Sequence, residues 1–335
     1  MCLTAVAVSA HAQSKPRVHI IGTGGTISNL GGNARRTIEE LVTAIPGMTS
    51  TAEVTFEQFS NIASGAITHE HWRNLAARIL AITKGPDAPA GIVITHGTDT
   101  MEETAFFLEL TVPTCAPIVL TGAMRQADAV GADGPANLLN AVRVAAARQA
   151  RGHGVLILMN DEIFRARDAT KTEASRMYAF TAPNAGPIGV TDPDSVAILR
   201  APGGRACTAV FDLTAISELP RVDVLYAHVA SDSVLVDAAV AAGARGLVIA
   251  GVGRGGIPPS QQRAVRRAVQ RGVSVAVSTR TGAGRVGQAF NPDSASRGAM
   301  IAAQDLNPQK ARILLMLGLA ARYDAARIAA LFRQP

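Results

Sequence analysis

Short apolar segments that alternate with helical patterns constrain the fold of this 335-residue chain most strongly. The segments are continuously apolar, which is typical of strands buried on both faces of a parallel sheet covered by helices. In the first part of the chain, strands are predicted at 17–21, 91–95, 117–121 and 154–159, and helices at 68–82, 100–110 and 135–150. We therefore predict a larger N-terminal parallel-sheet α/β domain over residues 17–205.

A second block of the same kind follows a Pro/Gly-rich stretch at 201–205. Short apolar strands are predicted at 222–226, 246–250 and 273–277, and a pair of helices begins near residue 307. This pattern predicts a linker at 206–220 and a smaller C-terminal α/β domain over 221–335. Such boundaries are accurate to a few residues.

The composition favours a globular protein with a large core, because 48% of the residues are hydrophobic and 17% are charged. No apolar run reaches the roughly 18 residues that a membrane span requires. The formal net charge is +6, but the basic residues are scattered arginines with no Lys/Arg run interleaved with aromatics. We therefore expect neither a membrane span nor a nucleic-acid partner.

The first residues resemble the end of a secretory signal. A small apolar run over residues 1–10 leads into Ala10-His11-Ala12, an A-x-A cleavage pattern. We predict a signal-peptide remnant at 1–12 and export to the periplasm, with an ordinary chain terminus as the alternative. Cys115 and Cys207 would then be the cysteines of the mature chain, and the sequence leaves open whether they pair or remain buried thiols.

Three polar clusters directly follow predicted strands: GTGGTIS at 22–28, THGTDT at 95–100 and TGAMR at 121–125. Ligands of open α/β sheets bind beyond the carboxyl ends of the strands, so we expect these clusters to meet in one crevice. The first cluster begins like a dinucleotide fingerprint, but Ile27 stands where the third glycine belongs. Glycines also let a backbone approach a ligand closely, and a hydroxyl on such a turn can attack a carbonyl. Thr26 is the candidate nucleophile, with a backbone-bonding turn threonine as the alternative.

The second cluster combines structural and chemical candidates. Thr100 and Glu103 have the spacing of a capping box, which leaves Thr98 as a second hydroxyl and Asp99 as a fixed charge for an ammonium group. His96 follows an apolar strand directly, so we expect a hydrogen-bonded core histidine rather than a general base. The sequence contains no H-E-x-x-H motif or other credible metal cluster, and we expect no metal and no cofactor.

At these residues the chain resembles the bacterial type II L-asparaginase and glutaminase-asparaginase family. The resemblance covers nearly the whole chain after the predicted leader, and TGGT together with HGTDT is a specific pair. The similar segments are TGGTI at 23–27, ITHGTDTMEETAFFL at 94–108, TGAMR at 121–125, ADGPANLLNAV at 132–142, VLILMND at 155–161, ARDATKT at 166–172, GVG at 251–253 and LNPQKAR at 306–312.

The resemblance implies a catalytic role for four residues. Thr26 would form an acyl-enzyme and release ammonia before water enters. Thr98, Asp99 and Lys171 would form a second triad in which the lysine polarises the second threonine. A lysine does this only when burial and neighbours lower its pKa toward neutrality.

The resemblance also implies substrate contacts and an assembly. Ser64 would hold the substrate carboxylate, Gly97 and Ala123 would offer backbone contacts, and Asp99 would bind the α-amino group. Gly65 stands where the family usually has Gln or Glu in contact with that amino group. The family assembles as a homotetramer of intimate dimers with sites at the dimer interface.

The chain also differs from the family at residues expected to contact the substrate, rather than at the catalytic residues. The lid at 28–37 is short and lacks the family's tyrosine. Arg254 follows GVG, where a partner-subunit asparagine is expected, and Ala289-Phe290-Asn291 stands where a partner-subunit glutamate is expected.

Three functions follow from these observations. The first is hydrolysis of L-asparagine to aspartate and ammonia. The second is the same chemistry on another small amide, such as glutamine, a D-isomer or an amide without a free α-amino group. The third is a catalytically silent periplasmic binding protein.

Overall fold

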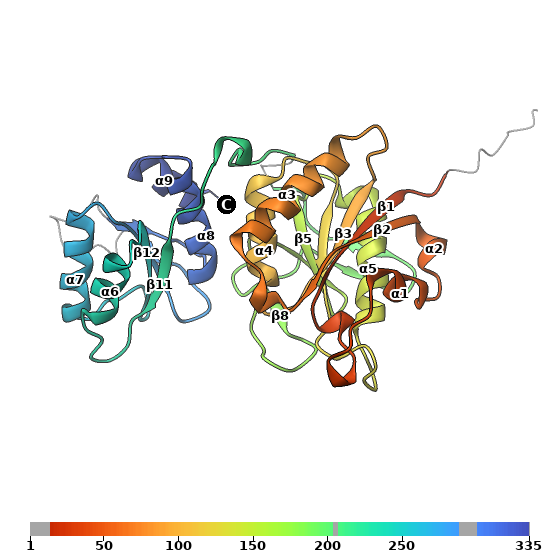
Figure 1. Cartoon of the computed structure of the whole chain (residues 1–335), viewed down its shortest axis with the longest axis horizontal. Helices are drawn as coiled ribbons and strands as arrows, with labels where there is room; N and C mark the ends of the chain where they lie inside the picture. The colour runs from red at the N-terminus through yellow and green to blue at the C-terminus, as the bar shows by residue number, and fades with distance from the viewer. Residues whose placement is uncertain (1–13, 204–206, 288–299, 335) are drawn as a thin grey trace, which may run out of the picture.

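The computed structural model describes residues 14–203, 207–287 and 300–334. These residues form two α/β units that lie side by side (Figure 1). The predicted signal remnant lies outside the described residues.

The N-terminal unit is built on an eight-stranded sheet with the order β10-β9-β6-β5-β4-β3-β1-β2. The pairs from β2 through β5 are parallel, which confirms the prediction for this part of the sheet. The other edge was not predicted: β6, β9 and β10 pair antiparallel. The strands are β1 Arg17–Gly24, β2 Glu53–Ile62, β3 Gly91–Thr95, β4 Ile118–Thr121, β5 Val155–Met159, β6 Glu162–Arg165, β9 Gly189–Thr191 and β10 Val196–Ile198, and β7 Thr170–Lys171 pairs with β8 Phe180–Thr181 in a separate hairpin.

Helices cover both faces of this sheet, as Figure 1 shows. Ile92 and Ile94 of β3 pack with α3 and α4 on one face, whereas Val93 between them packs with α1 and α5 on the other. Because successive strand residues face opposite sides, this double coverage explains why the strands are continuously apolar. The helices are α1 Ile38–Thr43, α2 Met48–Thr51, α3 His69–Lys84, α4 Met101–Thr111 and α5 Gly134–Ala146.

The C-terminal unit is a smaller parallel sheet with the order β11-β12-β13-β14. Helix α8 lies between the two units (Figure 1), and its apolar residues join the same buried cluster as those of α4. The two units therefore share one continuous core. The elements are β11 Val222–Tyr226, α6 Val234–Ala241, β12 Gly246–Gly251, α7 Pro259–Gln270, β13 Ser274–Thr279, β14 Met300–Ala302, α8 Pro308–Ala320 and α9 Ala325–Phe332.

A disulfide joins Cys115, just before β4, to Cys207 in the segment between the two sheets. This pairing answers the question that the sequence left open. The larger sheet ends at Ile198 and the smaller one begins at Val222. The linker boundaries at 206–220 stay a prediction.

Candidate active site

The crevice between β1 and β3 is the natural ligand site of this sheet. The chain leaves β1 toward α1 on one face and leaves β3 toward α4 on the other. In the strand order β2-β1-β3-β4-β5, the neighbouring carboxyl ends of β1 and β3 form the switch point at which ligands bind. Thr26 follows β1 and Thr98 follows β3, so both predicted hydroxyl residues lie at this switch point.

The loops after β1, β3 and β4 interlock through glycines. A Cβ added to Gly25 would lie 2.4 Å from both the Cα and the N of Gly97, and Gly25 has a φ of +89°. A Cβ on Gly122 would lie 2.4 Å from the His96 carbonyl oxygen and 3.4 Å from Cγ2 of Thr98. The three polar clusters therefore meet, as the sequence predicts, because residues without side chains allow the backbones to touch.

A lysine from the β7 hairpin reaches this crevice. Nζ of Lys171 donates a hydrogen bond to Oγ1 of Thr98 at 2.9 Å and lies 2.6 Å from Oδ1 of Asp99. The Lys171 side chain is 14% exposed, whereas that of Asp99 is 76% exposed. Thr98 and the Lys171 side chain are thus largely withdrawn from solvent, while the Asp99 carboxylate is accessible.

Thr26 begins the short 3-10 helix Thr26–Ser28, directly after Gly25. Its side chain is half-buried. None of the residues that the structure describes forms a hydrogen bond with its hydroxyl. That arrangement disfavours the alternative role, a turn threonine bonded to its own backbone.

Ser64 lies beside the same loops, whereas Gly65 faces open space. Ser64 is 5% exposed, and its Oγ lies 2.7 Å from where a Cβ on Gly97 would be. Gly65 is exposed, with no atom within 4 Å of an added Cβ. Ala123 is buried just after β4, with its Cβ against Gly134.

The capping box predicted at Thr100 and Glu103 is wrong. Thr100 is the N-cap residue of α4, but its side chain does not cap the helix. Its hydroxyl instead donates to the carbonyl oxygen of Ser64 at 2.9 Å. An N-cap oxygen accepts from a backbone amide and usually needs an extended backbone, whereas Thr100 has φ −122° and ψ 16°. The Thr100 hydroxyl therefore joins two neighbouring loops and does not cap the helix.

His96 is a buried core histidine, as the sequence predicts. Its Nδ1 lies 2.7 Å from the Gly97 carbonyl oxygen and its Nε2 lies 2.9 Å from Oγ1 of Thr104. Because the Gly97 carbonyl can only accept, Nδ1 carries the ring proton, and Nε2 of the neutral ring accepts from the Thr104 hydroxyl. The Thr104 oxygen in turn accepts the indole N–H of Trp72. Burial lowers the pKa of His96 to about 4. A neutral ring already bonded at both nitrogens is unsuited to act as a general base.

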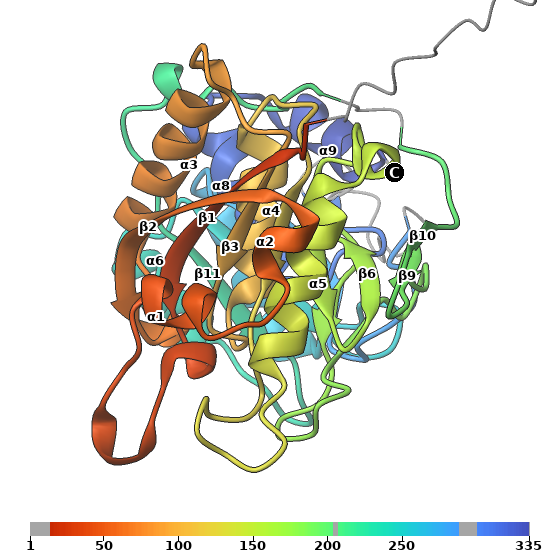
Figure 2. The same cartoon turned by 90° about the vertical axis from the view of Figure 1, so that its right-hand side faces the viewer.

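The segment 28–37, which corresponds to the family's lid, is tied to a neighbouring loop. The lid closes on itself through a bridge between Asn29 and Arg35. The Gly31 amide donates to a carboxylate oxygen of Asp128 at 2.8 Å, and the Ala127 amide donates to the Asn29 carbonyl at 2.9 Å. Figure 2 shows the two loops projecting together from one end of the N-terminal unit.

The predicted partner-subunit positions are only partly described. Arg254 lies on an exposed turn closed by a bridge between Val252 and Gly256. The segment Ala289-Phe290-Asn291 lies outside the described residues.

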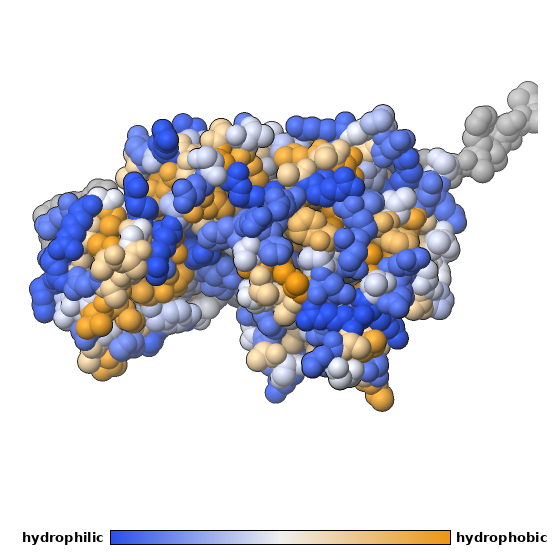
Figure 3. Space-filling view, in the orientation of Figure 1, coloured by the Kyte–Doolittle hydropathy of each residue, from blue (hydrophilic) through white to orange (hydrophobic). Residues whose placement is uncertain are grey.

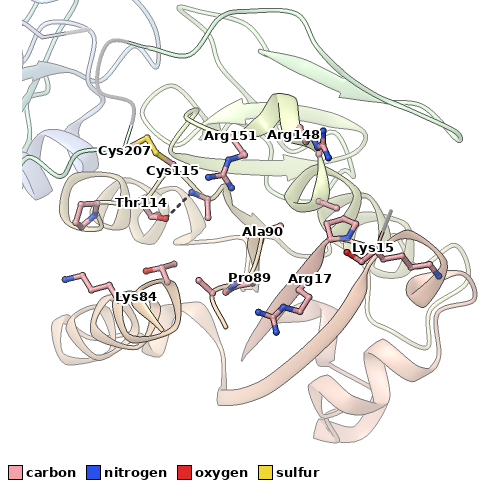
Figure 4. Close-up of a pocket in the computed structure, with 18 residues that line it drawn as sticks. Lys15, Arg17, Lys84, Pro89, Ala90, Thr114, Cys115, Arg148, Arg151 and Cys207 are labelled. Atoms are coloured by element: carbon pink, nitrogen blue, oxygen red, sulfur yellow. Dashed lines mark hydrogen bonds between the residues drawn. A yellow bond between two sulfur atoms is a disulfide. The ribbon is translucent and has the colours of Figure 1, made fainter. Parts of the chain in front are cut away.

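A cavity of about 1250 Å³ lies at the opposite, amino end of the strands and includes none of the predicted site residues (Figure 4). Its walls carry Lys15, Arg17, Lys84, Arg148 and Arg151, together with the disulfide. Lys84 ends α3 and Arg148 follows α5 closely, where positive charge complements the helix dipoles. These two cations therefore have a structural explanation.

A buried polar cluster behind Lys171 was missed by the sequence reasoning. Glu102, Asn307 and Lys310 belong to segments that were recognised as family-like but given no role. Glu102 is 4% exposed and Lys310 is 1% exposed. The signal available in the sequence was a charged residue at an apolar helix position.

Comparisons with known proteins agree with this architecture. Residues 17–203 match the N-terminal asparaginase family model, and residues 221–332 match the glutaminase/asparaginase C-terminal domain model. The fold and the crevice thus define an amidohydrolase of the asparaginase type. The chain belongs to the asparaginase family.

Individual relatives cover almost the whole chain. The chain is 40% identical to L-asparaginase 2 of Bacillus subtilis (97% of this chain, 89% of the relative). It is 38% identical to L-asparaginase 2 of Escherichia coli (97% and 95%). The crystal structure of a probable cytoplasmic L-asparaginase from Campylobacter jejuni superposes with a TM-score of 0.90 at 37% identity, covering 96% of this chain and 100% of that one.

Proposed function

We propose that this protein hydrolyses the side-chain amide of L-asparagine to aspartate and ammonia through an acyl-enzyme on Thr26. The observation that carries the proposal is the 2.9 Å contact between Nζ of Lys171 and Oγ1 of Thr98, next to the turn that presents Thr26. An accessible hydroxyl and a hydroxyl paired with an amine on the two sides of one crevice are the parts that a two-step acyl transfer requires.

In the first step, Oγ1 of Thr26 attacks the amide carbon and its proton passes to the departing nitrogen. The carbon–nitrogen bond breaks and ammonia leaves. In the second step, water attacks the Thr26 ester as it gives a proton to Oγ1 of Thr98, whose own hydroxyl proton passes to Nζ of Lys171. The bond between the acyl carbon and Oγ1 of Thr26 then breaks, and the proton held by the Thr98–Lys171 pair passes to Oγ1 of Thr26. Aspartate is released and the Thr26 hydroxyl is restored. Gly97 and Ala123 would contact the substrate through their backbones, and Ser64 would hold its carboxylate.

Asp99 is proposed to bind the substrate α-amino group. Its side chain is largely exposed, and Oδ1 is the oxygen that faces Lys171. A charge-assisted hydrogen bond contributes about 1.5–3 kcal/mol, which corresponds to about 10- to 150-fold in affinity.

A second candidate is the same reaction on another small amide. Gly65 favours it, because the family usually has Gln or Glu here in contact with the substrate α-amino group, and Gly65 leaves open space at this position. A relative from Pseudomonas fluorescens, 37% identical, is named glutaminase-asparaginase. The ratio of kcat/KM for asparagine to that for succinamic acid distinguishes the two: a ratio near one favours the second candidate.

The Thr26→Ala variant tests the mechanism, with Thr26→Ser as the matched control that keeps a hydroxyl. We expect Thr26→Ala to lose at least about 1000-fold in kcat while calorimetry still detects asparagine binding, and Thr26→Ser to retain measurable turnover. Near-normal ammonia release by Thr26→Ala would exclude the mechanism. Tight asparagine binding without ammonia release by the wild type would instead indicate the silent binding protein.

Export to the periplasm is also part of the proposal. The Cys115–Cys207 disulfide supports it, since such bonds persist mainly in oxidising compartments. A relative from Haemophilus influenzae, 39% identical, is named a probable periplasmic L-asparaginase, although the Campylobacter jejuni structure is described as probably cytoplasmic. Fractionation of expressing cells, followed by detection of the chain, tests this assignment.

A homotetramer of intimate dimers is proposed for the assembly. Tyr226, Val229, Val234 and Leu235 are between 57% and 92% exposed around the start of α6. Figure 3 shows hydrophobic surface on this side of the C-terminal unit. A contiguous exposed apolar surface is typical of a subunit interface, and light scattering measures the assembly directly.

None of the helices in the described part of the chain is long and apolar enough to cross a membrane. Within the same residues, no group of three or more His, Cys, Asp or Glu side chains could hold a metal ion.

A further inference from the structure

A buried polar cluster connects helix α8 of the C-terminal unit to the segment that carries Lys171. Nζ of Lys310 donates to the carbonyl oxygen of Arg167 at 2.9 Å and to that of Ala169. The same ammonium lies 3.8 Å from Oε2 of Glu102. These contacts fix the backbone immediately before β7.

Glu102 holds the next two residues. Its Oε1 accepts hydrogen bonds from the Thr170 hydroxyl at 2.9 Å and from the backbone amide of Lys171 at 3.3 Å. Asn307, at the start of α8, donates its amide to Oε2 of Glu102 at 2.7 Å and to the Thr170 hydroxyl at 3.0 Å. One carboxylate thus receives bonds from both domains.

Glu102 also lies in the first turn of α4, directly after the loop that carries Thr98 and Asp99. Both ends of the relay, the Lys171 backbone and the Thr98 loop, are therefore positioned relative to the same carboxylate. A shift of this cluster would change the distance between Nζ of Lys171 and Oγ1 of Thr98.

Stability alone does not explain this buried charged cluster. A buried ion pair costs free energy to desolvate, and apolar residues of the same volume often stabilise a core equally well. Burial lowers the pKa of Lys310 to about 8, which still leaves the ammonium charged near pH 7. The Lys310 ammonium is bonded to two backbone carbonyls, so its effect is to fix the geometry of the segment before β7.

We propose that Lys310, Asn307 and Glu102 are positioning residues that hold Lys171 against Thr98, so that the C-terminal domain completes the active site of its own subunit. This inference rests on the proposed function. It adds a role for the α8 segment that the reaction scheme above does not use.

The test compares two substitutions in helix α8, each at a residue that bonds to the N-terminal unit. Lys310→Met removes the ammonium. Arg312→Met is the matched control, because Arg312 also lies on α8 and contacts His69 of the N-terminal unit at 3.0 Å. None of the hydrogen bonds or ion pairs found for Arg312 in the described structure reaches residues 167–171.

We expect Lys310→Met to lower kcat by about 10- to 100-fold with KM within about twofold of wild type, because misplacement of about 1 Å has effects of this size. Hydrogen exchange of the peptide covering 166–173 should rise in the same variant. Arg312→Met should leave kcat and this exchange at wild-type values.

Wild-type kcat in Lys310→Met, or an equal loss of kcat in Arg312→Met, would overturn the proposal. If Lys310→Met does not fold, the double variant Lys310→Met/Glu102→Gln removes both buried charges and is judged by the same criteria. If the wild type has no amidase activity, the proposed function fails, and hydrogen exchange still decides whether Lys310 fixes the Lys171 segment.

Discussion

Acidification should destabilise this protein through His96, which the structure holds neutral. The ring is completely buried and bonded at both nitrogens, to Gly97 and Thr104. Burial lowers its pKa from 6.5 to about 4. In the unfolded chain the ring is solvated and takes up a proton near pH 6.5.

The direction of this pH dependence of stability follows from proton uptake by the unfolded chain. Between pH 6.5 and about 4 the unfolded chain binds a proton at His96 that the folded chain does not, so the free energy of unfolding falls as the pH falls. The stabilisation is fully present above pH 6.5 and is exhausted below about 4. One pKa unit corresponds to about 1.4 kcal/mol, so the whole effect is on the order of 3 kcal/mol.

Urea unfolding followed by circular dichroism at pH 7.5 and 4.5 measures this effect at one fixed protein concentration. His96→Gln keeps an oxygen acceptor for the Thr104 hydroxyl and does not titrate. His228→Gln is the matched control, because His228 is exposed. The wild type and His228→Gln should each lose about 2–3 kcal/mol more than His96→Gln between the two pH values. Equal losses in all three proteins would refute the assignment of His96 as a neutral buried group.

Three further outcomes are expected. Gly25→Ala should abolish most activity, because its Cβ would lie 2.4 Å from the Gly97 backbone, whereas Gly32→Ala, with a φ of +74° but open space, should remain active in an ammonia assay. Cys207→Ser should lower the free energy of unfolding by about 4–5 kcal/mol in urea titrations, since the disulfide closes a loop with a sequence separation of 92; no change in the urea midpoint would contradict this. Asp99→Asn should reduce kcat/KM for asparagine about 10- to 100-fold more than for succinamic acid, and an equal reduction would argue against an ammonium contact.

Apolar pattern and turn chemistry in the sequence alone identified most central elements. The strand predicted at 91–95 is β3, and the strand predicted at 222–226 is β11, with the same bounds. Strand β3 is buried on both faces, and its sequence shows this as a continuous apolar run from Gly91 to Ile94. The family could also be recognised, since the motifs around Thr26 and Thr98 are contiguous in the sequence.

Edge strands lack such a continuous apolar run. Residues of β2 alternate in type and are mostly half-exposed or exposed, so Glu53–Ile62 was not predicted, although it is a ten-residue strand. The predicted helix at 135–150 ends at Ala146, and a 3-10 turn follows. Local propensity is weak at such boundaries, where tertiary contacts decide the conformation.

Which distant groups meet depends on the packing of elements that lie far apart in the sequence. Lys171 and Thr98 are 73 positions apart, and their 2.9 Å contact depends on how the β7 hairpin packs against α4 and α8. The same holds for the pairing of Cys115 with Cys207 and for the burial of Lys310 between the domains. The sequence identified the candidate catalytic residues and the central strands, because both follow from local pattern. The distances between the reactive groups come from long-range packing, which has no local signature.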